Sequence, residues 1–230
     1  MIKRFDTAYG FSVSCQEGSF FAKTLESLGK WEPVETEAVS SVIRRNDFVV
    51  DVGAHVGWYS LLSASRGASV FAFEPNPTLF ELLEENVRRS NWSGSIAARP
   101  WAIGEEHCED RFYLPSTYDD GWGSLRHSDL GDAAPVVDVS VFPLRDVVPD
   151  GERIRLLKTD TEGAELFVLK SFGARLFSDV DYVFVELNDE RLKYFDTRSE
   201  DVVAYLVGAG FNRELTFGEN ALFKSLAVPR

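Results

Sequence analysis

A run of acidic residues follows an apolar segment in the second half of the chain. Residues 158–165 read Lys-Thr-Asp-Thr-Glu-Gly-Ala-Glu, so Asp160 and Glu162 come directly after the apolar run 154–159. Carboxylates placed close together raise each other's pKa, which suits a general base that removes a proton from a hydroxyl group. The spacing therefore predicts acid–base chemistry here, with Asp160 or Glu162 as the base.

Two further residues are candidates for the same chemistry. Glu186 lies at the end of the apolar run 182–187, and His127 lies in a polar and aromatic loop. If the two apolar runs are neighbouring parallel strands, Glu186 converges on Asp160 and Glu162, because ligands collect where such strands end. Three carboxylates are also oxygen ligands that Mg²⁺ accepts, so a metal-assisted reaction stays open although none is expected. No His and Cys cluster indicates zinc.

A second motif lies nearer the N-terminus, between an apolar run and a helical pattern. It reads Asp51-Val-Gly-Ala-His-Val-Gly57, and Glu74 ends the next apolar run. Gly53 permits a sharp turn and Gly57 permits the backbone to approach a ligand closely, because neither residue has a Cβ. A carboxylate at the position of Glu74 can accept both hydroxyls of a ribose. The motif predicts a nucleoside-binding site.

The details of the turn distinguish two cofactors. A dinucleotide site reads G-x-G-x-x-G, because a pyrophosphate lies on the helix N-terminus. Here the turn is opened by Asp51, which would repel a pyrophosphate and attract an ammonium group. S-adenosylmethionine has an ammonium group and a ribose but no phosphate. The turn therefore favours S-adenosylmethionine over NAD.

These motifs need an α/β domain with a largely parallel sheet to position them, and the chain alternates accordingly. Capping boxes place helix starts at Thr78 with Glu81 and at Thr197 with Glu200. The expected strands are 47–52, 69–73, 95–103, 154–159 and 182–187, followed by an antiparallel hairpin of 213–217 with 221–226. Helices are expected at 58–66, after Thr78, at 164–172 and up to Gly208.

The expected organisation is a single domain. Residues 1–45 form an N-terminal cover segment, and residues 46–230 form the α/β domain. The alternation breaks between about 104 and 149, where strands at 111–114 and 136–142 indicate a short β insertion. Long loops in compact domains often bind ligands, so the loop 118–129 within the insertion is a candidate lid over the acceptor substrate. The candidate substrate-binding residues are Trp122, Ser124 and Arg126 of this loop together with Glu186, and His127 of the loop is a competing candidate for the base.

Charge narrows the classes of partner. The 230 residues include 37 acidic and 24 basic side chains, a net charge of −13. Such a chain is poorly suited to nucleic acids or anionic membranes, which bind Lys and Arg. No apolar run approaches the ~20 residues that span a bilayer, and Cys15 and Cys108 have no metal-ligand spacing. We expect a soluble cytoplasmic protein with a small-molecule acceptor, and the sequence predicts no oligomeric state.

A resemblance to a known family rests on two stretches, VVDVGAHVGWYSLLSASRGASVFAFEPNPTLFELLEENVRRSN and LLKTDTEGAELFVLKSF. Together they hold D-x-G-A-x-x-G, A-F-E-P-x-P and K-x-D-x-E-G-x-E in that order. The combination resembles the FkbM family of S-adenosylmethionine-dependent methyltransferases, over roughly residues 31–215. Shorter similarities are Trp31-Glu32-Pro33, Ala102-Ile103-Gly104, Gly123-Ser124-Leu125 and Glu186.

The resemblance implies a Rossmann-like class I methyltransferase fold with a seven-stranded, mostly parallel sheet. It also implies O-methylation of a hydroxyl on a sugar or natural product. The turn residues Gly53, Ala54, His55 and Gly57 would bind the methionine end of the cofactor, and Asp51 its ammonium group. Glu74, followed by Pro75, would bind the ribose, Trp101 and Ala102 would border the adenine, and Asp160 would lie near the methyl group. The family more often has Asn where this chain has His55, whose imidazole would add a pH-dependent group.

Alternatives remain at this point. N-methylation of an amine or peptide uses the same cofactor, and a non-catalytic S-adenosylmethionine-binding regulator could use the same fold. An NAD-dependent oxidoreductase is disfavoured by the turn. N-methylation of DNA or RNA is disfavoured by the net charge of −13.

Overall fold

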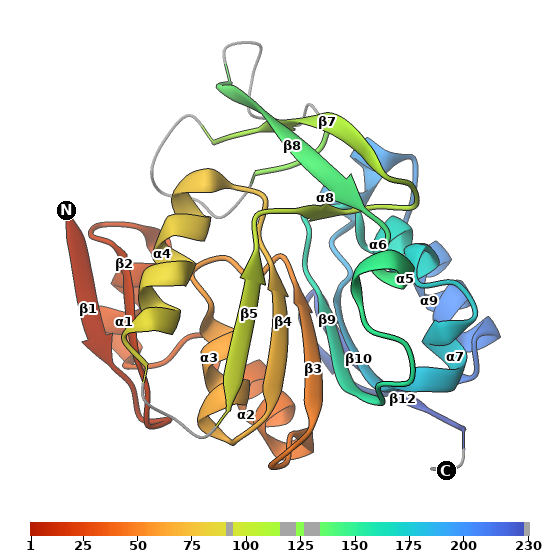
Figure 1. The fold of residues 1–230 in the computed structure, drawn as a ribbon, viewed down its shortest axis with the longest axis horizontal. Coiled ribbons are helices and arrows are strands. Elements are labelled where there is room, and N and C mark those ends of the chain that lie inside the picture. The colour runs from red at the N-terminus through yellow and green to blue at the C-terminus, as the bar shows by residue number, and fades with distance from the viewer. Residues whose placement is uncertain (91–93, 116–122, 127–133, 228–230) are drawn as a thin grey trace.

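The computed structural model describes residues 1–90, 94–115, 123–126 and 134–227. Its centre is a seven-stranded sheet (Figure 1) whose strands are β3 (Phe48–Val52), β4 (Ser69–Phe73), β5 (Ser95–Arg99), β9 (Ile154–Thr159), β10 (Val180–Glu186), β11 (Phe211–Phe217) and β12 (Asn220–Ser225). The order is β11-β12-β10-β9-β3-β4-β5. The five strands β10, β9, β3, β4 and β5 are parallel to one another, and β12 pairs antiparallel with both β10 and β11. The predicted fold class is confirmed.

The central parallel strands are mostly apolar because the sheet is covered on both faces. Val49 and Val50 are adjacent in β3, yet they belong to two different core clusters, one on each face. Helices α1 (Phe20–Leu28), α2 (Pro33–Val42), α3 (Trp58–Ser65) and α4 (Pro77–Arg88) contribute to the first cluster. The second includes residues of α5 (Leu144–Val147), α6 (Glu165–Ser171), α7 (Arg175–Asp179), α8 (Asp189–Leu192) and α9 (Ser199–Gly208). A 3₁₀ turn, η1 (Lys193–Phe195), follows α8.

The N-terminal segment packs on the face formed by α3 and α4. It begins with a hairpin of β1 (Ile2–Asp6) and β2 (Ser12–Gln16), followed by α1 and α2. Asn86 of α4 joins β2 to the rest of the domain, since its amide group accepts a hydrogen bond from the Ser14 N–H and donates to the carbonyl oxygens of Ser14 and Val56. This contact brings β2 and α1 beside the turn that follows β3.

The β insertion is a separate three-stranded sheet, β6 (Ala102–Ile103), β8 (Val136–Phe142) and β7 (Cys108–Tyr113), in that spatial order. Figure 1 shows it across the top of the molecule, beyond the ends of β4 and β5. The prediction of one strand over 95–103 is wrong, because β5 ends at Arg99 and β6 belongs to the insertion. Pro100, which has no N–H to donate, separates the two strands.

Both predicted capping boxes are misplaced. Asn76, not Thr78, caps α4: its side chain accepts hydrogen bonds from the N–H groups of Thr78 and Leu79, and Pro77 occupies the first helical position. The Thr197 hydroxyl instead donates to the Leu192 carbonyl, and α9 starts after Arg198. Several side chains near a helix start can bind its free N–H groups, so sequence spacing alone does not select one.

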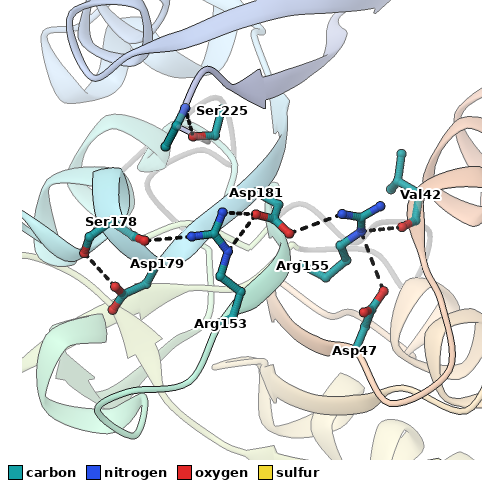
Figure 2. A network of polar contacts seen from close by, with 9 residues as sticks. Val42, Asp47, Arg153, Arg155, Ser178, Asp179, Asp181 and Ser225 are labelled. Carbon is teal, nitrogen blue, oxygen red and sulfur yellow. Dashed lines mark hydrogen bonds and ion pairs between the residues drawn. The ribbon is translucent and has the colours of Figure 1, made fainter. Parts of the chain in front are cut away.

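A network of charged side chains joins the amino ends of three strands (Figure 2). Asp181 in β10 accepts hydrogen bonds from Arg153, just before β9, and from Arg155 within it. Arg155 also donates to the Val42 carbonyl at 2.7 Å and lies 3.6 Å from the Asp47 carboxylate, before β3. The network holds the sheet at the end opposite to the carboxyl ends of β3 and β9.

At those carboxyl ends the backbones of β3 and β9 come unusually close. Gly53 has φ +74°, and a Cβ at this position would lie 1.8 Å from the carbonyl oxygen of Asp160. The Asp160 N–H donates to the Val52 carbonyl at 3.2 Å. Only glycine fits this position, because the obstacle is backbone and cannot rotate away.

Among the described residues, no helix combines the length and the apolar composition that crossing a bilayer requires.

We predict that Asp181→Asn lowers the free energy of unfolding by about 1–2 kcal/mol, because two arginines lose their shared anion. Urea denaturation measures the loss. Asp150→Asn is the matched control: it also removes an arginine partner, but the Asp150 side chain is 93% exposed, so its loss stays below about 0.5 kcal/mol. Equal losses in the two variants would show that the network contributes nothing specific.

We predict that Gly53→Ala destabilises the protein far more than Gly10→Ala. Both glycines have positive φ, +74° and +83°, but nothing lies within 4 Å of the added carbon at Gly10. Gly10→Ala therefore reports only the backbone cost, about 1–2 kcal/mol. Gly53→Ala adds the clash with Asp160 and should lose at least about 2 kcal/mol more. Thermal and urea unfolding measure both, and similar losses would disprove the close approach.

Candidate active site

A cavity of about 320 Å³ lies where β3, β4, β9 and β10 end. Its wall includes five carboxylate side chains and one lysine among the described residues. The acids are Glu32, Glu74, Asp160, Glu162 and Glu186, and the cation is Lys158. Acidic side chains outnumber basic ones on this wall, which favours a ligand that carries positive charge.

The turn after β3 forms one part of the cavity wall. The N–H groups of Gly53 and Ala54 both donate to the Phe73 carbonyl, which ties the turn to the end of β4. His55 has φ +54°, and its N–H donates to the Glu74 carboxylate at 2.8 Å. Gly57 is not part of the wall: its missing Cβ leaves room for Leu83, whose Cδ1 would otherwise lie 2.6 Å away. Gly57 thus serves helix packing, not the ligand approach expected from the sequence.

Glu74 lies where the sequence predicts it, at the end of β4 on the cavity wall. Its two carboxylate oxygens accept the N–H groups of His55 (2.8 Å) and Asn76 (2.9 Å). Burial raises the pKa of Glu74 to about 7, although these two hydrogen bonds act in the opposite direction. Each oxygen retains a lone pair, so the side chain remains able to accept two hydroxyls.

Asp51 lies behind the wall and not on it. Its side chain is 1% exposed; one oxygen accepts the Ser60 hydroxyl at 2.6 Å, and the other lies 3.5 Å from the Lys158 ammonium. The sequence assigns a cofactor ammonium group to Asp51. The structure instead places Asp51 against side chains of its own chain.

Lys158 is the buried cation that Asp51 contacts. Its Nζ donates to the Gly53 carbonyl at 2.6 Å and lies 3.5 Å from the carboxylates of both Asp51 and Asp160. Burial by itself would lower the pKa of Lys158, but the surrounding carboxylates raise it above its ordinary value. Lys158 therefore stays charged and neutralises part of the acidic site.

His55 does not titrate near neutral pH. Burial, together with the charge of Lys158, lowers the pKa of the imidazole to about 4. Its ring packs edge-on against Phe21 of α1, with ring centroids 5.5 Å apart. The pH dependence that the sequence suggests for His55 is thus not expected above about pH 5.

The three carboxylates predicted to converge do so. Oxygens of Asp160, Glu162 and Glu186 lie within 4.8 Å of one another. Glu162 pairs with Arg191 (3.1 Å), and burial with the Asp160 charge raises its pKa to about 8. Glu186 Oε2 is buried without a hydrogen-bond partner among the described residues, and burial raises its pKa well above the ordinary value. Within the cluster, Glu162 can therefore accept and release a proton near pH 8.

The loop that carries Asp160 and Glu162 is held by Glu165. The Glu165 carboxylate accepts the N–H groups of Thr161 and Gly163 and the Thr161 hydroxyl, and the side chain is 1% exposed. Glu162 itself has φ +56°, a costly conformation for a residue with a side chain. The role of Glu165 is to shape this loop.

The same cluster is a possible cation site, since its ligands are all oxygen. Two of its three carboxylates already have cationic neighbours, however: Arg191 beside Glu162 and Lys158 beside Asp160. A divalent ion would add to positive charge that is already present. The donor set therefore fits proton transfer better than metal binding.

Of the predicted insertion residues, Trp122 and His127 lie outside the described residues. The Ser124 hydroxyl donates to the Glu162 carbonyl (3.2 Å), and Gly123 and Leu125 on either side line the cavity. Arg126 points elsewhere: it pairs with Asp110 at 3.3 Å and lies over the Phe195 ring. The insertion thus contacts the acidic loop through Ser124.

Pro75, Trp101 and Ala102 all line the cavity, as the predicted ribose and adenine contacts require. The Trp101 ring is also packed against Phe73 and Phe142, with centroids 6.4 Å and 4.5 Å away. Trp101 therefore belongs to the core and to the wall at once.

Sequence reasoning missed the contribution of the N-terminal segment. The cavity wall includes Cys15, Phe20, Phe21, Trp31 and Glu32, together with Tyr59 of α3. The signal present in the sequence was Trp31-Glu32-Pro33, which the family resemblance marked only weakly. A residue from a segment without clear periodicity cannot be assigned to a site until the chain is folded.

Comparison with known proteins identifies the family. The model of the family described as "Methyltransferase FkbM domain" matches residues 51–215. Methyltransferase 1 of Beauveria bassiana is 30% identical over 169 residues, covering 64% of this chain and 66% of that protein. The chain thus spans about two thirds of the length of this relative.

Two further relatives have more specific names. The hexuronic acid methyltransferase AglP of Haloferax volcanii is 27% identical over 213 residues, covering 89% of this chain and 82% of that protein. The 31-O-demethyl-FK506 methyltransferase FkbM of Streptomyces tacrolimicus is 29% identical over 199 residues, with 74% of each chain covered.

Solved structures agree on the fold. The methyltransferase FkbM of Methylobacillus flagellatus superposes with a TM-score of 0.51 at 18% identity, covering 83% of this chain and 50% of that chain. A Streptococcus mutans protein crystallised with SAH has a TM-score of 0.50 at 10% identity, covering 84% of this chain and 97% of that chain. With the family match over residues 51–215, the chain belongs to the FkbM family of methyltransferases.

Proposed function

We propose that the protein transfers a methyl group from S-adenosylmethionine to a hydroxyl oxygen of a small molecule, a sugar or a natural product. The observation that carries the proposal is one cavity with Glu74 at the end of β4 and the cluster of Asp160, Glu162 and Glu186 at the ends of β9 and β10. The names of AglP and of the Streptomyces FkbM describe methylation of a hexuronic acid and of an oxygen. Both support the acceptor class.

The cavity suits this cofactor in size and charge. Its volume of about 320 Å³ lies in the range of small-molecule sites, and acids outnumber cations on its wall. S-adenosylmethionine carries positive charge on its sulfonium and ammonium groups. Glu74 would accept the ribose hydroxyls, and Trp101 with Ala102 would border the adenine. The Asp160 end of the cavity would then receive the methyl group.

When bound, the cofactor supplies a methyl group on a positively charged sulfur, and transfer leaves the electron pair of the broken bond on that sulfur. The acceptor oxygen must lose its proton as the new bond to carbon forms. Glu162 is suited to take that proton, because Arg191 orients its carboxylate and its pKa is about 8. Asp160, 3.5 Å from Lys158, positions the acceptor.

The overall charge of the protein also supports a small-molecule acceptor. A net charge of −13 favours a small acceptor over a nucleic acid or an anionic membrane. N-methylation of an amine is the alternative, because the same acids could orient an amine. The three converging acids favour an enzyme over a regulator without activity.

We predict that Glu162→Gln lowers kcat by about 100-fold or more, the usual contribution of a general base. The wild-type rate should rise with pH through about 8, and the variant should lose this rise, because the titrating group is gone. Steady-state kinetics with glycoside and polyketide hydroxyls as acceptors measure both effects. Asp160→Asn should raise KM for the acceptor as well.

The control is Glu190→Gln, an exposed acid next to Arg191 in sequence, which should leave kcat unchanged. Unchanged turnover in both Asp160→Asn and Glu162→Gln would overturn the assignment of the base. Activity that disappears with EDTA and returns with Mg²⁺ would favour the metal-assisted reaction. Transfer to amines but not hydroxyls would replace O-methylation by N-methylation.

We predict that S-adenosylhomocysteine binds more tightly as pH rises from 6 to 8, by about tenfold. Glu32 and Glu74 both have pKa values raised to about 7, so acidification protonates them and weakens their interactions with the ligand's ammonium group and ribose hydroxyls. Binding should therefore release protons at pH 7. Titration calorimetry in two buffers of different ionisation enthalpy counts them, and a pH-independent affinity without proton release would contradict the proposal.

A further inference from the structure

Glu32 is a cavity-lining acid that comes from outside the motifs of the α/β domain. It directly precedes α2 and has φ 40° and ψ 66°, a left-handed conformation that a residue with a side chain adopts only at a cost. Thr36 holds this conformation: its N–H donates to the Glu32 carbonyl and its hydroxyl to the Trp31 carbonyl, both at 2.8 Å. Trp58 of α3 in turn donates to the Thr36 hydroxyl at 2.9 Å. The backbone of Glu32 is therefore fixed to the wall of the cavity.

The Glu32 side chain is held at one oxygen and free at the other. The Tyr59 hydroxyl donates to Oε2 at 2.5 Å, and Oε1 has no hydrogen-bond or ion-pair partner among the described residues. Burial, with the nearby charge of Asp160, raises the pKa of Glu32 to about 7. A carboxylate in this situation gains from a cationic ligand more than an exposed one would.

The other acids near the β3 turn are already engaged. Asp51 lies off the cavity wall and contacts Ser60 and Lys158. Asp160 belongs to the cluster with Glu162 and Glu186 and has Lys158 beside it. Glu74 accepts two backbone N–H groups at the end of β4. On the described cavity wall, Glu32 and Glu186 each have an oxygen without a partner and no cation within ion-pair distance. Glu186 belongs to the carboxylate cluster at the ends of β9 and β10, so Glu32 is the one that lies apart from that cluster.

We propose that Glu32 binds the α-ammonium group of the cofactor's methionine moiety, with Tyr59 positioning its carboxylate. The proposal rests on S-adenosylmethionine being the cofactor. In this proposal, Glu32 takes the role that the sequence suggests for Asp51, and the N-terminal segment becomes part of the cofactor site. Two acids from different elements, Glu32 and Glu74, then bind the two polar ends of the cofactor.

The test uses a pair of ligands that differ only in the ammonium group. These are S-adenosylhomocysteine and its deamino analogue, in which hydrogen replaces the ammonium group. Titration calorimetry on the full chain gives both Kd values at pH 8, where Glu32 is ionised. The wild type should bind S-adenosylhomocysteine about 10- to 100-fold more tightly than the analogue, the usual range for a charge-assisted hydrogen bond. Glu32→Gln should abolish this preference and leave the affinity for the analogue within about twofold.

Three variants complete the experiment. Glu37→Gln, an exposed acid on α2, should keep the full preference. Asp51→Asn should also keep it, and Glu32→Asp should restore part of it. Loss of the preference in Asp51→Asn but not in Glu32→Gln would assign the ammonium group to Asp51 and overturn the proposal. Equal weakening of both ligands in Glu32→Gln would also overturn it, because it would indicate a structural role. If the wild type binds neither ligand, the proposed cofactor itself is wrong.

Discussion

This site depends on the contacts of one buried ammonium group, that of Lys158. It bonds to the Gly53 carbonyl and lies between the carboxylates of Asp51 and Asp160, so it joins the end of β3 to the end of β9. Without a cation at this position, the carboxylates on the cavity wall would repel one another in a poorly hydrated space. Its own pKa is raised because these acids outweigh its burial. Lys158 is nevertheless a single cation on a wall with five acidic side chains, so a cationic ligand is still favoured.

The close contact of two strand ends makes this arrangement possible. Gly53 brings the β3 turn against the Asp160 carbonyl, where any larger residue would collide. Parallel strands end on the same edge of the sheet, and the side chains that follow them therefore meet. Asp160 and Glu186 come from adjacent strands, and Glu165 shapes the loop that adds Glu162. The result is a cluster of three carboxylates in which burial and the Asp160 charge raise the pKa of Glu162 to about 8.

The N-terminal segment completes the cavity from outside the strand and helix alternation. Its position depends on long-range contacts, such as those of Asn86 with Ser14 and of Trp58 with Thr36. A strained backbone at Glu32 persists because these contacts hold it. The same segment places Phe21 against His55, which contributes to the burial that keeps the imidazole neutral. The N-terminal segment and the cavity wall thus pack as one unit.

The sequence by itself determined the sheet, its parallel strands and hairpin, and the acids at the strand ends. Periodicity and strand-end position are local signals, and they sufficed for Glu74 and for the convergence of Asp160, Glu162 and Glu186. Only the tertiary structure decided which way each side chain faces. It turned Asp51 toward Ser60 and Lys158, assigned Gly57 to packing against Leu83, and brought Glu32 onto the wall. The reason is physical: these placements depend on contacts between residues far apart in the chain, and on the burial that those contacts create.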